Sequence, residues 1–214
     1  NLFHGSLVRL APVDPQEFSR AAADWGRQSD YWRLMASIPP ALFSAKATQT
    51  WIEKNLESKT GYSFTIRTLA NDRLIGEIEL DGINWTHGDT FVGISIGVKD
   101  LWGKGYGSDA MRVILRFAFL ELNLHRVSLN TFEYNPRAIR SYEKVGFVHE
   151  GRMRQYLNKE GQRYDLILAA NGYHPISDYL RALSPDGIYV VAGGSMLQLF
   201  QAAFQGRRAS KTGN

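Results

Sequence analysis

The segment VKDLWGKGYGSDAMRVILRFAFLELNL, residues 98–124, is the most informative part of the sequence. Three of its glycines alternate with Lys104 and Tyr106, and a helical pattern begins directly behind them. Glycine suits positions where the backbone must adopt a positive φ or approach another group closely. The first turn of a helix adds unpaired N–H groups and the positive end of the helix dipole. We therefore predict that this loop binds a phosphate or pyrophosphate group through its backbone.

The composition is that of a folded protein of ordinary polarity. Of the 214 residues, 44% are hydrophobic and 21% are charged, which predicts one globular domain with room for an appendage. No apolar run approaches the roughly 18 to 20 residues of a membrane span, and the residues 1–10 lack the layout of a signal peptide. We therefore expect a cytoplasmic protein that makes no membrane contact.

Cysteine, histidine and charge narrow the chemistry further. The chain has no cysteine, which excludes disulfides and thiolate metal ligands, and its five histidines are scattered. The chemistry is therefore expected to need no metal. The net charge of +4 is carried in part by the final residues, GRRASKTGN, which we interpret as a solvated basic terminus. No nucleic acid partner is expected.

Before the glycine loop, the pattern predicts one strand, two helices and a three-stranded meander. A strand over 7–13 leads into a helix with Asp14 as N-cap and Pro15 at its first position. The second helix covers 45–58. Three segments of near-period-two alternation then predict antiparallel strands over 61–69, 74–84 and 90–98.

The connection between these two helices, residues 31–44, is predicted to be irregular. It contains Pro39 and Pro40, a pair that would stop a helix. Its aromatic residues Tyr31, Trp32 and Phe43 have two interpretations of equal weight. They either line a substrate entrance or pack beneath a long loop.

Behind the glycine loop, we predict a helix, a strand, a short helix and a hairpin. The first helix has one apolar stripe, formed by Met111, Ile114, Leu115, Ala118 and Leu122. A strand over 125–132 leads to NPRAIRSYEKVGF, where Asn135 fits the N-cap and Gly146 the C-terminal stop. Strands over 147–158 and 162–170 form the hairpin. The predicted class is α/β (α+β), with a mixed, mostly antiparallel central sheet flanked by helices.

This order of elements resembles the GNAT acyltransferase superfamily over residues of about 2–170. The loop WGKGYGSDA, followed at a distance by NPRAIRSYEKVGF, is similar to the two motifs of that family. The branch that the chain resembles contains ribosomal-protein N-terminal acetyltransferases together with antibiotic and polyamine acetyltransferases. The resemblance implies transfer of an acetyl group from acetyl-coenzyme A to a primary amine, by direct attack in a ternary complex. Neither a metal nor a covalent enzyme intermediate is implied.

The resemblance also implies a set of coenzyme-binding residues. Backbone N–H groups of the loop would hold the pyrophosphate, with the pantetheine arm inserted between splayed strands 94–98 and 125–129. Trp102 stands where the family has Gln or Arg, a departure that leaves the backbone contacts possible. Asn135 would bond the pantetheine or a water on it, in addition to capping its helix, and small Gly97 would permit the close approach. The full set comprises Ile96, Val98, Gly103, Lys104, Gly105, Tyr106, Gly107, Ser108 and Asn135.

The same resemblance assigns catalytic roles. Tyr142 would donate a proton to the leaving coenzyme A sulfur, although a structural tyrosine is the alternative. Many relatives carry the general base as a glutamate at the position that aligns with Phe91. Period two places Glu77, Glu79 and Asp81 on one face of the neighbouring strand. If that face lines the active-site cleft, Glu79 acting through water is the expected base; if it faces outward, all three acids are solvated.

Residues 171–214 lie beyond the family resemblance. They predict a short helix, the apolar strand GIYVVAGG and a second helix, similar to the late part of the dinucleotide domain of medium-chain alcohol dehydrogenases. This C-terminal extension lacks the glycine fingerprint and the ribose-binding acid, so it would not bind NAD alone. We interpret it as a natural or engineered fusion fragment. Its apolar strand needs covering by the acyltransferase core or by a second copy of the chain, and a homodimer is therefore plausible.

Two alternative functions remain open at this level. A non-catalytic coenzyme A-binding module is conceivable because Phe91 replaces the usual base. An oxidoreductase is disfavoured because the glycine loop follows an antiparallel meander and does not open a βαβ unit. If the protein is an N-acetyltransferase, its acceptor is a small-molecule amine or a peptide N-terminus. Its specificity is expected to come from residues 25–44, 82–90 and 150–164.

Overall fold

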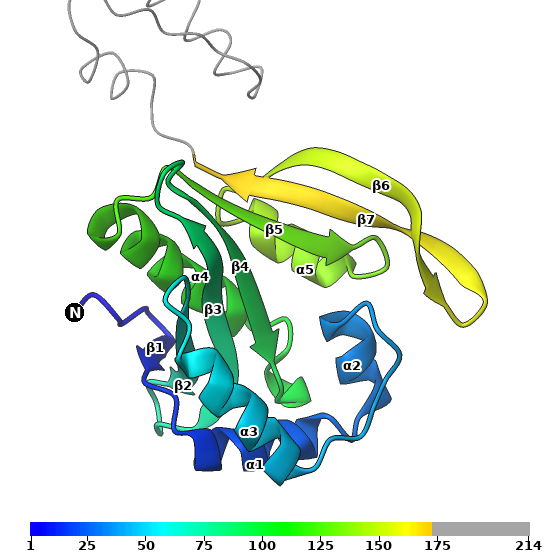
Figure 1. Cartoon of the computed structure of the whole chain (residues 1–214), viewed down its shortest axis with the longest axis horizontal. Helices are drawn as coiled ribbons and strands as arrows, with labels where there is room; N and C mark the ends of the chain where they lie inside the picture. Colours follow the sequence, from blue (N-terminus) through cyan, green and yellow to red (C-terminus); the bar gives the residue numbers. More distant parts are fainter. Residues whose placement is uncertain (173–214) are drawn as a thin grey trace, which may run out of the picture. The chain divides into compact units, whose positions relative to one another are not determined.

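A seven-stranded sheet organises residues 1–172, the part of the chain that this computed structural model describes (Figure 1). The strands are β1 (Val8–Ala11), β2 (Tyr62–Thr68), β3 (Leu74–Asn84), β4 (Asp89–Ile96), β5 (Arg126–Phe132), β6 (Val148–Lys159) and β7 (Gln162–Asn171). Their order is β1-β2-β3-β4-β5-β7-β6, and every neighbouring pair is antiparallel except β4 and β5. The predicted mixed, mostly antiparallel sheet is confirmed. The interpretation of the extension falls on residues outside the described range, apart from the end of β7.

Helices cover both faces of this sheet. They are α1 (Pro15–Trp25), α2 (Ser29–Met35), α3 (Ala45–Leu56), α4 (Tyr106–Arg116) and α5 (Pro136–Glu143), with a 3₁₀ turn η1 (Lys99–Leu101) and a π-helical turn η2 (Phe117–Glu121). On one face, Ile78 and Leu80 of β3 are buried in the same core as Met111 and Ile114 of α4. A second cluster unites α1, α2 and α3 through Phe18, Trp25, Tyr31 and Ile52. No helix within residues 1–172 is long and apolar enough to cross a bilayer.

Local capping explains where several helices begin. The Asp14 carboxylate accepts hydrogen bonds from the N–H groups of Gln16 and Glu17, and the Asn135 side chain accepts one from Ala138. Both N-caps are as predicted, with proline at the first helical position in each case. Most of the predicted stripe of α4 is buried as well, with Met111, Ile114, Leu115 and Ala118 in the core.

The prediction of an irregular connection over 31–44 was wrong for its first part. Ser29–Met35 form α2, which has no side-chain N-cap bond and is anchored by buried Tyr31. The Tyr31 hydroxyl donates a hydrogen bond of 3.0 Å to Ser95 Oγ on β4. Of the aromatic residues, Trp32 packs against Phe43 with ring centroids 5.5 Å apart, whereas Tyr31 lines a cavity. The role of this segment as a substrate entrance stays a prediction.

The parallel strands β4 and β5 separate soon after they begin. They pair only at Asp89–Phe91 with Arg126–Ser128, and Figure 1 shows them diverging beyond this point. β4 continues along β3 as far as Ile96, while β5 continues along β7 as far as Phe132. The predicted splay of residues 94–98 is therefore present and opens a gap in the middle of the sheet. The prediction was wrong for residues 125–129, because Arg126–Ser128 still pair with β4 and only the later part of β5 diverges.

Candidate active site

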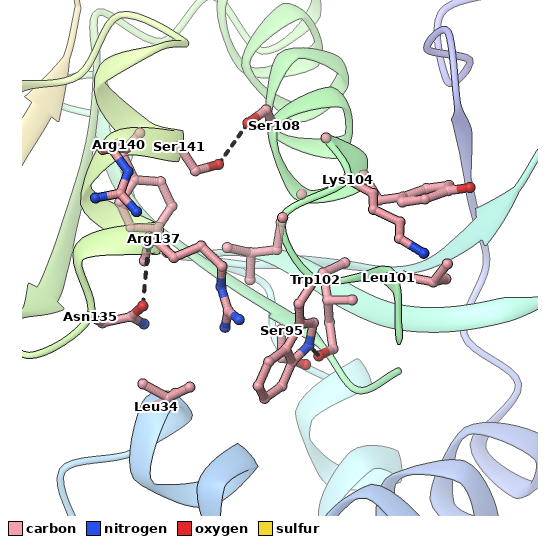
Figure 2. A pocket seen from close by; sticks show the side chains of 18 of the residues that line it. Leu34, Ser95, Leu101, Trp102, Lys104, Ser108, Asn135, Arg137, Arg140 and Ser141 are labelled. Atoms are coloured by element: carbon pink, nitrogen blue, oxygen red, sulfur yellow. Dashed lines mark hydrogen bonds between the residues drawn. The ribbon is translucent and has the colours of Figure 1, made fainter. Parts of the chain in front are cut away.

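A cavity of about 630 Å³ lies at the open end of the gap between β4 and β5 (Figure 2). The glycine loop and the first turn of α4 form one wall, and α5 forms the facing wall. Ile94, Ser95 and Ile96 of β4 contribute a third side, and Leu34 of α2 contributes to the fourth. The two motifs that stand apart in the sequence therefore meet across one cavity.

The glycine loop has the backbone geometry expected of an anion-binding turn. Gly103 and Gly105 have φ values of 75° and 91°, in the left-handed region that favours glycine, and Gly105 is the N-cap of α4. The N–H groups of Tyr106, Gly107 and Ser108 lie in the first helical turn, where the helix supplies no carbonyl partner. All residues from Gly103 to Ser108 line the cavity. The Ser108 hydroxyl itself lies 2.7 Å from that of Ser141 on α5.

Basic side chains surround this cavity, and sequence analysis missed most of them. Arg137 and Arg140 of α5 and its C-cap residue Lys144 line it together with the predicted Lys104. Their spacing of three and four residues places them on one side of the helix, a signal that was present in the sequence. A coenzyme A molecule carries a diphosphate and a further phosphate at one end. Free N–H groups and four cationic side chains are a donor set that fits these groups.

The β4 backbone differs in part from the expected coenzyme contacts. Ile96 lines the cavity, but its carbonyl accepts a hydrogen bond of 2.6 Å from the Trp102 indole Nε1. Val98 does not line the cavity, and its carbonyl accepts a bond from Leu101. Gly97 is required for a different reason than expected, because a Cβ there would lie 1.9 Å from the Trp25 ring.

Tyr142 lies where the large cavity continues into a second one. It lines both cavities, and its hydroxyl makes no hydrogen bond within residues 1–172. Burial raises the pKa of Tyr142 to about 12, against the opposing effect of Arg137. The hydroxyl is therefore a protonated donor at neutral pH.

The second cavity, of about 290 Å³, carries carboxylates. It shares Ile94, Asn135 and Tyr142 with the first cavity, and Glu79 and Asp81 line its wall. The question of which way the acidic face of β3 points is thus answered: Glu79 and Asp81 face the cavity. Phe91, the residue that aligns with the usual base, lines the same cavity.

Glu77 lies next to this acidic pair on β3, opposite Ser95 of β4. Its Oε1 is 3.4 Å from the donating Ser95 Oγ, so Tyr31, Ser95 and Glu77 form a chain of hydrogen bonds. Burial and the neighbouring Glu79 raise the pKa of Glu77 to about 7. Burial also raises the pKa of Glu79, with a further contribution from Asp81.

Comparison with known proteins identifies the family of the chain. Residues 8–148 match the family model described as an acetyltransferase (GNAT) domain. The chain belongs to the GNAT acetyltransferase family. Among its relatives is the uncharacterized N-acetyltransferase YokL of a Bacillus subtilis prophage, 34% identical over 125 residues, which are 58% of this chain and 68% of YokL.

Two further GNAT comparisons involve Vibrio cholerae. Its spermidine N(1)-acetyltransferase is 34% identical over 97 residues, which are 45% of this chain and 56% of that protein. A crystal structure of a spermidine N-acetyltransferase in complex with CoA and spermine shares the fold, with a TM-score of 0.69 and 23% identity. That match covers 77% of this chain and 94% of the other.

These findings establish the class of reaction. The protein is an acetyl-CoA-dependent N-acetyltransferase, as the resemblance implied. Its relatives are named as enzymes, which argues against a module that only binds coenzyme A. The transferase family also argues against the oxidoreductase alternative.

Proposed function

We propose that this N-acetyltransferase acts on a small-molecule amine that carries more than one positive charge. The observation that supports this proposal is the second cavity, which continues from the basic cavity past Tyr142 and has Glu79 and Asp81 in its wall. The first cavity is lined by basic side chains and the second by acidic ones, and each attracts a substrate of the opposite charge. The polyanionic donor fits the first, and a cationic acceptor fits the second.

The backbone of the glycine loop and the cationic side chains hold the donor in this proposal. The N–H groups of Gly103 and of Gly105 to Ser108 receive the diphosphate, whereas that of Lys104 already donates to the Leu101 carbonyl. The side chains of Lys104, Arg137 and Arg140 supply charge around it. The thioester supplies an activated acyl carbon. Asn135 uses its Oδ1 to cap α5 through the Ala138 N–H. Its amide nitrogen remains free within residues 1–172 to donate toward the pantetheine arm.

Glu79 is the proposed general base. It accepts, through a water molecule, the proton that the amine nitrogen loses as the new C–N bond forms. Burial raises the pKa of Glu79, and a general base is most effective when its pKa lies close to the working pH. Asp81 lies one period further along β3 and is exposed, so it is suited to attract a second ammonium group of the acceptor.

Tyr142 is the proposed general acid. As the C–S bond breaks, its hydroxyl proton passes to the sulfur, and the products are the N-acetylated amine and the free thiol. Glu79 then carries one proton too many and Tyr142 one too few. Exchange with solvent restores both groups, so the cycle balances without a covalent enzyme intermediate.

A steady-state assay with acetyl-CoA and a panel of amines tests the acceptor. We expect the highest kcat/KM for a polyamine such as spermidine, a lower value for an alkyl monoamine of similar length, and a lower value still for a peptide N-terminus. Asp81→Asn should reduce the preference for the polyamine over the monoamine. Faster acetylation of the peptide than of every polyamine would refute the proposed acceptor class.

The sequence further predicts a cytoplasmic location, no nucleic acid partner and a homodimer, and these stay predictions. The homodimer is tested by light scattering on the full chain. A mass of twice 24.2 kDa is the expected result.

A further inference from the structure

Trp102 stands at the mouth of the coenzyme cavity and contacts both of its sides (Figure 2). Its indole Nε1 donates to the Ile96 carbonyl of β4 at 2.6 Å. On the ring face, the Arg137 guanidinium carbon lies 4.1 Å from the centroid, in a cation–π stack. Because Arg137 belongs to α5, the stacked pair bridges the space between the loop side and the α5 side of the cavity.

The Ile96 carbonyl is the group that an added strand would use. The Gly97 N–H points toward β3, because it donates to the Ile75 carbonyl of that strand. The Ile96 carbonyl belongs to the same trans peptide as this N–H and therefore points the opposite way, away from β3 and into the gap. An extended amide chain lying in the gap would donate to this oxygen. In this structure the Trp102 indole already occupies that position.

Arg137 is available to leave the stack. It forms no ion pair within residues 1–172, although it is half-buried in the wall of a cavity that Lys104 and Arg140 also line. A guanidinium without a carboxylate partner gains a bidentate bond when a phosphate arrives. The unphosphorylated end of a pantetheine offers no such bond.

We propose that Trp102 and Arg137 determine the selectivity of the site for phosphorylated acyl donors. The diphosphate draws Arg137 away from the indole, Trp102 then releases the Ile96 carbonyl, and the first pantetheine amide takes its place. An acyl pantetheine without phosphates has to displace the same two side chains, but it forms no phosphate–guanidinium bond that would offset the cost. The inference rests on the proposal that coenzyme A lies in this cavity, and it adds the residues that select the donor.

Titration calorimetry on the full chain tests this, with coenzyme A and pantetheine as the two probes. Trp102→Phe keeps a ring for Arg137 but removes the N–H donor. We expect it to bind pantetheine about three- to tenfold more tightly than the unaltered protein, the range of one net hydrogen bond, with coenzyme A changed less. Arg137→Lys keeps the charge but loses the planar stack. It should also tighten pantetheine, while Arg137→Gln should weaken coenzyme A about tenfold or more without weakening pantetheine.

Arg112→Gln is the matched control, because Arg112 is exposed on α4 and lines neither cavity. It should leave the affinities for both probes unchanged. The selectivity proposal is overturned if Trp102→Phe and Arg137→Lys both melt as the parent does and neither binds pantetheine more tightly. Failure of the unaltered protein to bind coenzyme A would be a different result, because it would overturn the coenzyme site itself.

Discussion

The side-chain hydroxyls of Ser108 and Ser141 lie 2.7 Å apart, and this contact joins the first turn of α4 to α5. The first turn of α4 holds the N–H groups proposed to bind the diphosphate, and α5 carries Arg137 and Tyr142. A hydrogen bond between polar side chains thus links the two motifs directly. In the proposed mechanism, we expect donor binding and acid catalysis both to depend on this contact.

Replacement of Ser141 tests this coupling. Ser141→Ala leaves the Ser108 hydroxyl without its partner, and we expect a loss of about 1 kcal/mol in the free energy of unfolding. The KM for acetyl-CoA should rise a few-fold, because the loop and α5 no longer hold a fixed distance. Urea unfolding and steady-state kinetics measure the two effects. Ser141→Thr keeps a hydroxyl and is the control; equal KM values for the Ala variant and the parent would contradict the coupling.

The glycines of the loop should differ in their tolerance of a side chain. Gly105 has a φ of 91°, where an L-residue is strained, so Gly105→Ala should lose about 1–2 kcal/mol of stability together with coenzyme affinity. Gly107 is helical, and a Cβ there would come no closer than 3.8 Å to Ile96. Gly107→Ala should therefore fold at least as well as the parent. Thermal melting of the two variants compares their stabilities. Equal decreases in melting temperature for Gly105→Ala and Gly107→Ala would contradict this expectation.

Tyr142 should be required for the chemical step more than for folding. Tyr142→Phe keeps the ring beside Phe147 and removes only the hydroxyl, so kcat should fall about 10²-fold with a small change in melting temperature. Because burial raises the pKa of Tyr142 to about 12, the parent should keep its acid form throughout pH 6–9. Coenzyme A release with a thiol reagent measures the rate. A variant as fast as the parent would show that Tyr142 is structural.

Glu79 should carry the general-base role. Glu79→Gln preserves the shape of the side chain but cannot accept a proton, and we expect kcat/KM to fall about 10²- to 10⁴-fold. The parent rate should rise with pH as the carboxyl ionises, at a pH above that of an ordinary glutamate because the pKa of Glu79 is raised by burial. The pH profile of kcat/KM for one amine tests this. Retention of the parent rate and profile in the variant would assign the base elsewhere.

Glu77 should make stability depend on pH. Its pKa is raised by burial from an ordinary 4.5 to about 7. Between these values the folded state keeps a proton that the unfolded chain has lost, so the free energy of unfolding falls as the pH rises. Glu77→Gln removes this dependence and should be about 1–3 kcal/mol more stable than the parent at pH 8, with little difference at pH 4. Denaturant titrations at both pH values give the comparison; parallel curves would contradict it.

The sequence predicted features that depend on neighbouring residues. The caps at Asp14 and Asn135 and the positive φ of Gly105 arise from contacts or conformations within a few residues. Strand alternation placed Glu77 and Glu79 on a common face for the same reason. Which way that face points was open, because it is set by how α4 packs on the opposite face of β3.

Individual side-chain contacts outside the regular helix and strand patterns were not predicted. The helix α2 is held through Tyr31 by Ser95, which lies 64 residues further along the chain. Trp102 bonding to Ile96 is a side-chain contact with the backbone, and no local pattern indicates it. Gly97 was assigned to the approach of pantetheine, whereas the Trp25 ring fills the space beside it. In each case tertiary packing determined the outcome.

A crystal structure with coenzyme A and spermidine bound is the most direct measurement of the central claim. The account predicts the diphosphate on the glycine loop, the pantetheine arm between β4 and β5, and the sulfur beside Tyr142, with the amine in the cavity that Glu79 lines. Coenzyme A bound outside the gap between β4 and β5, or a sulfur pointing away from Tyr142 and Glu79, would contradict it.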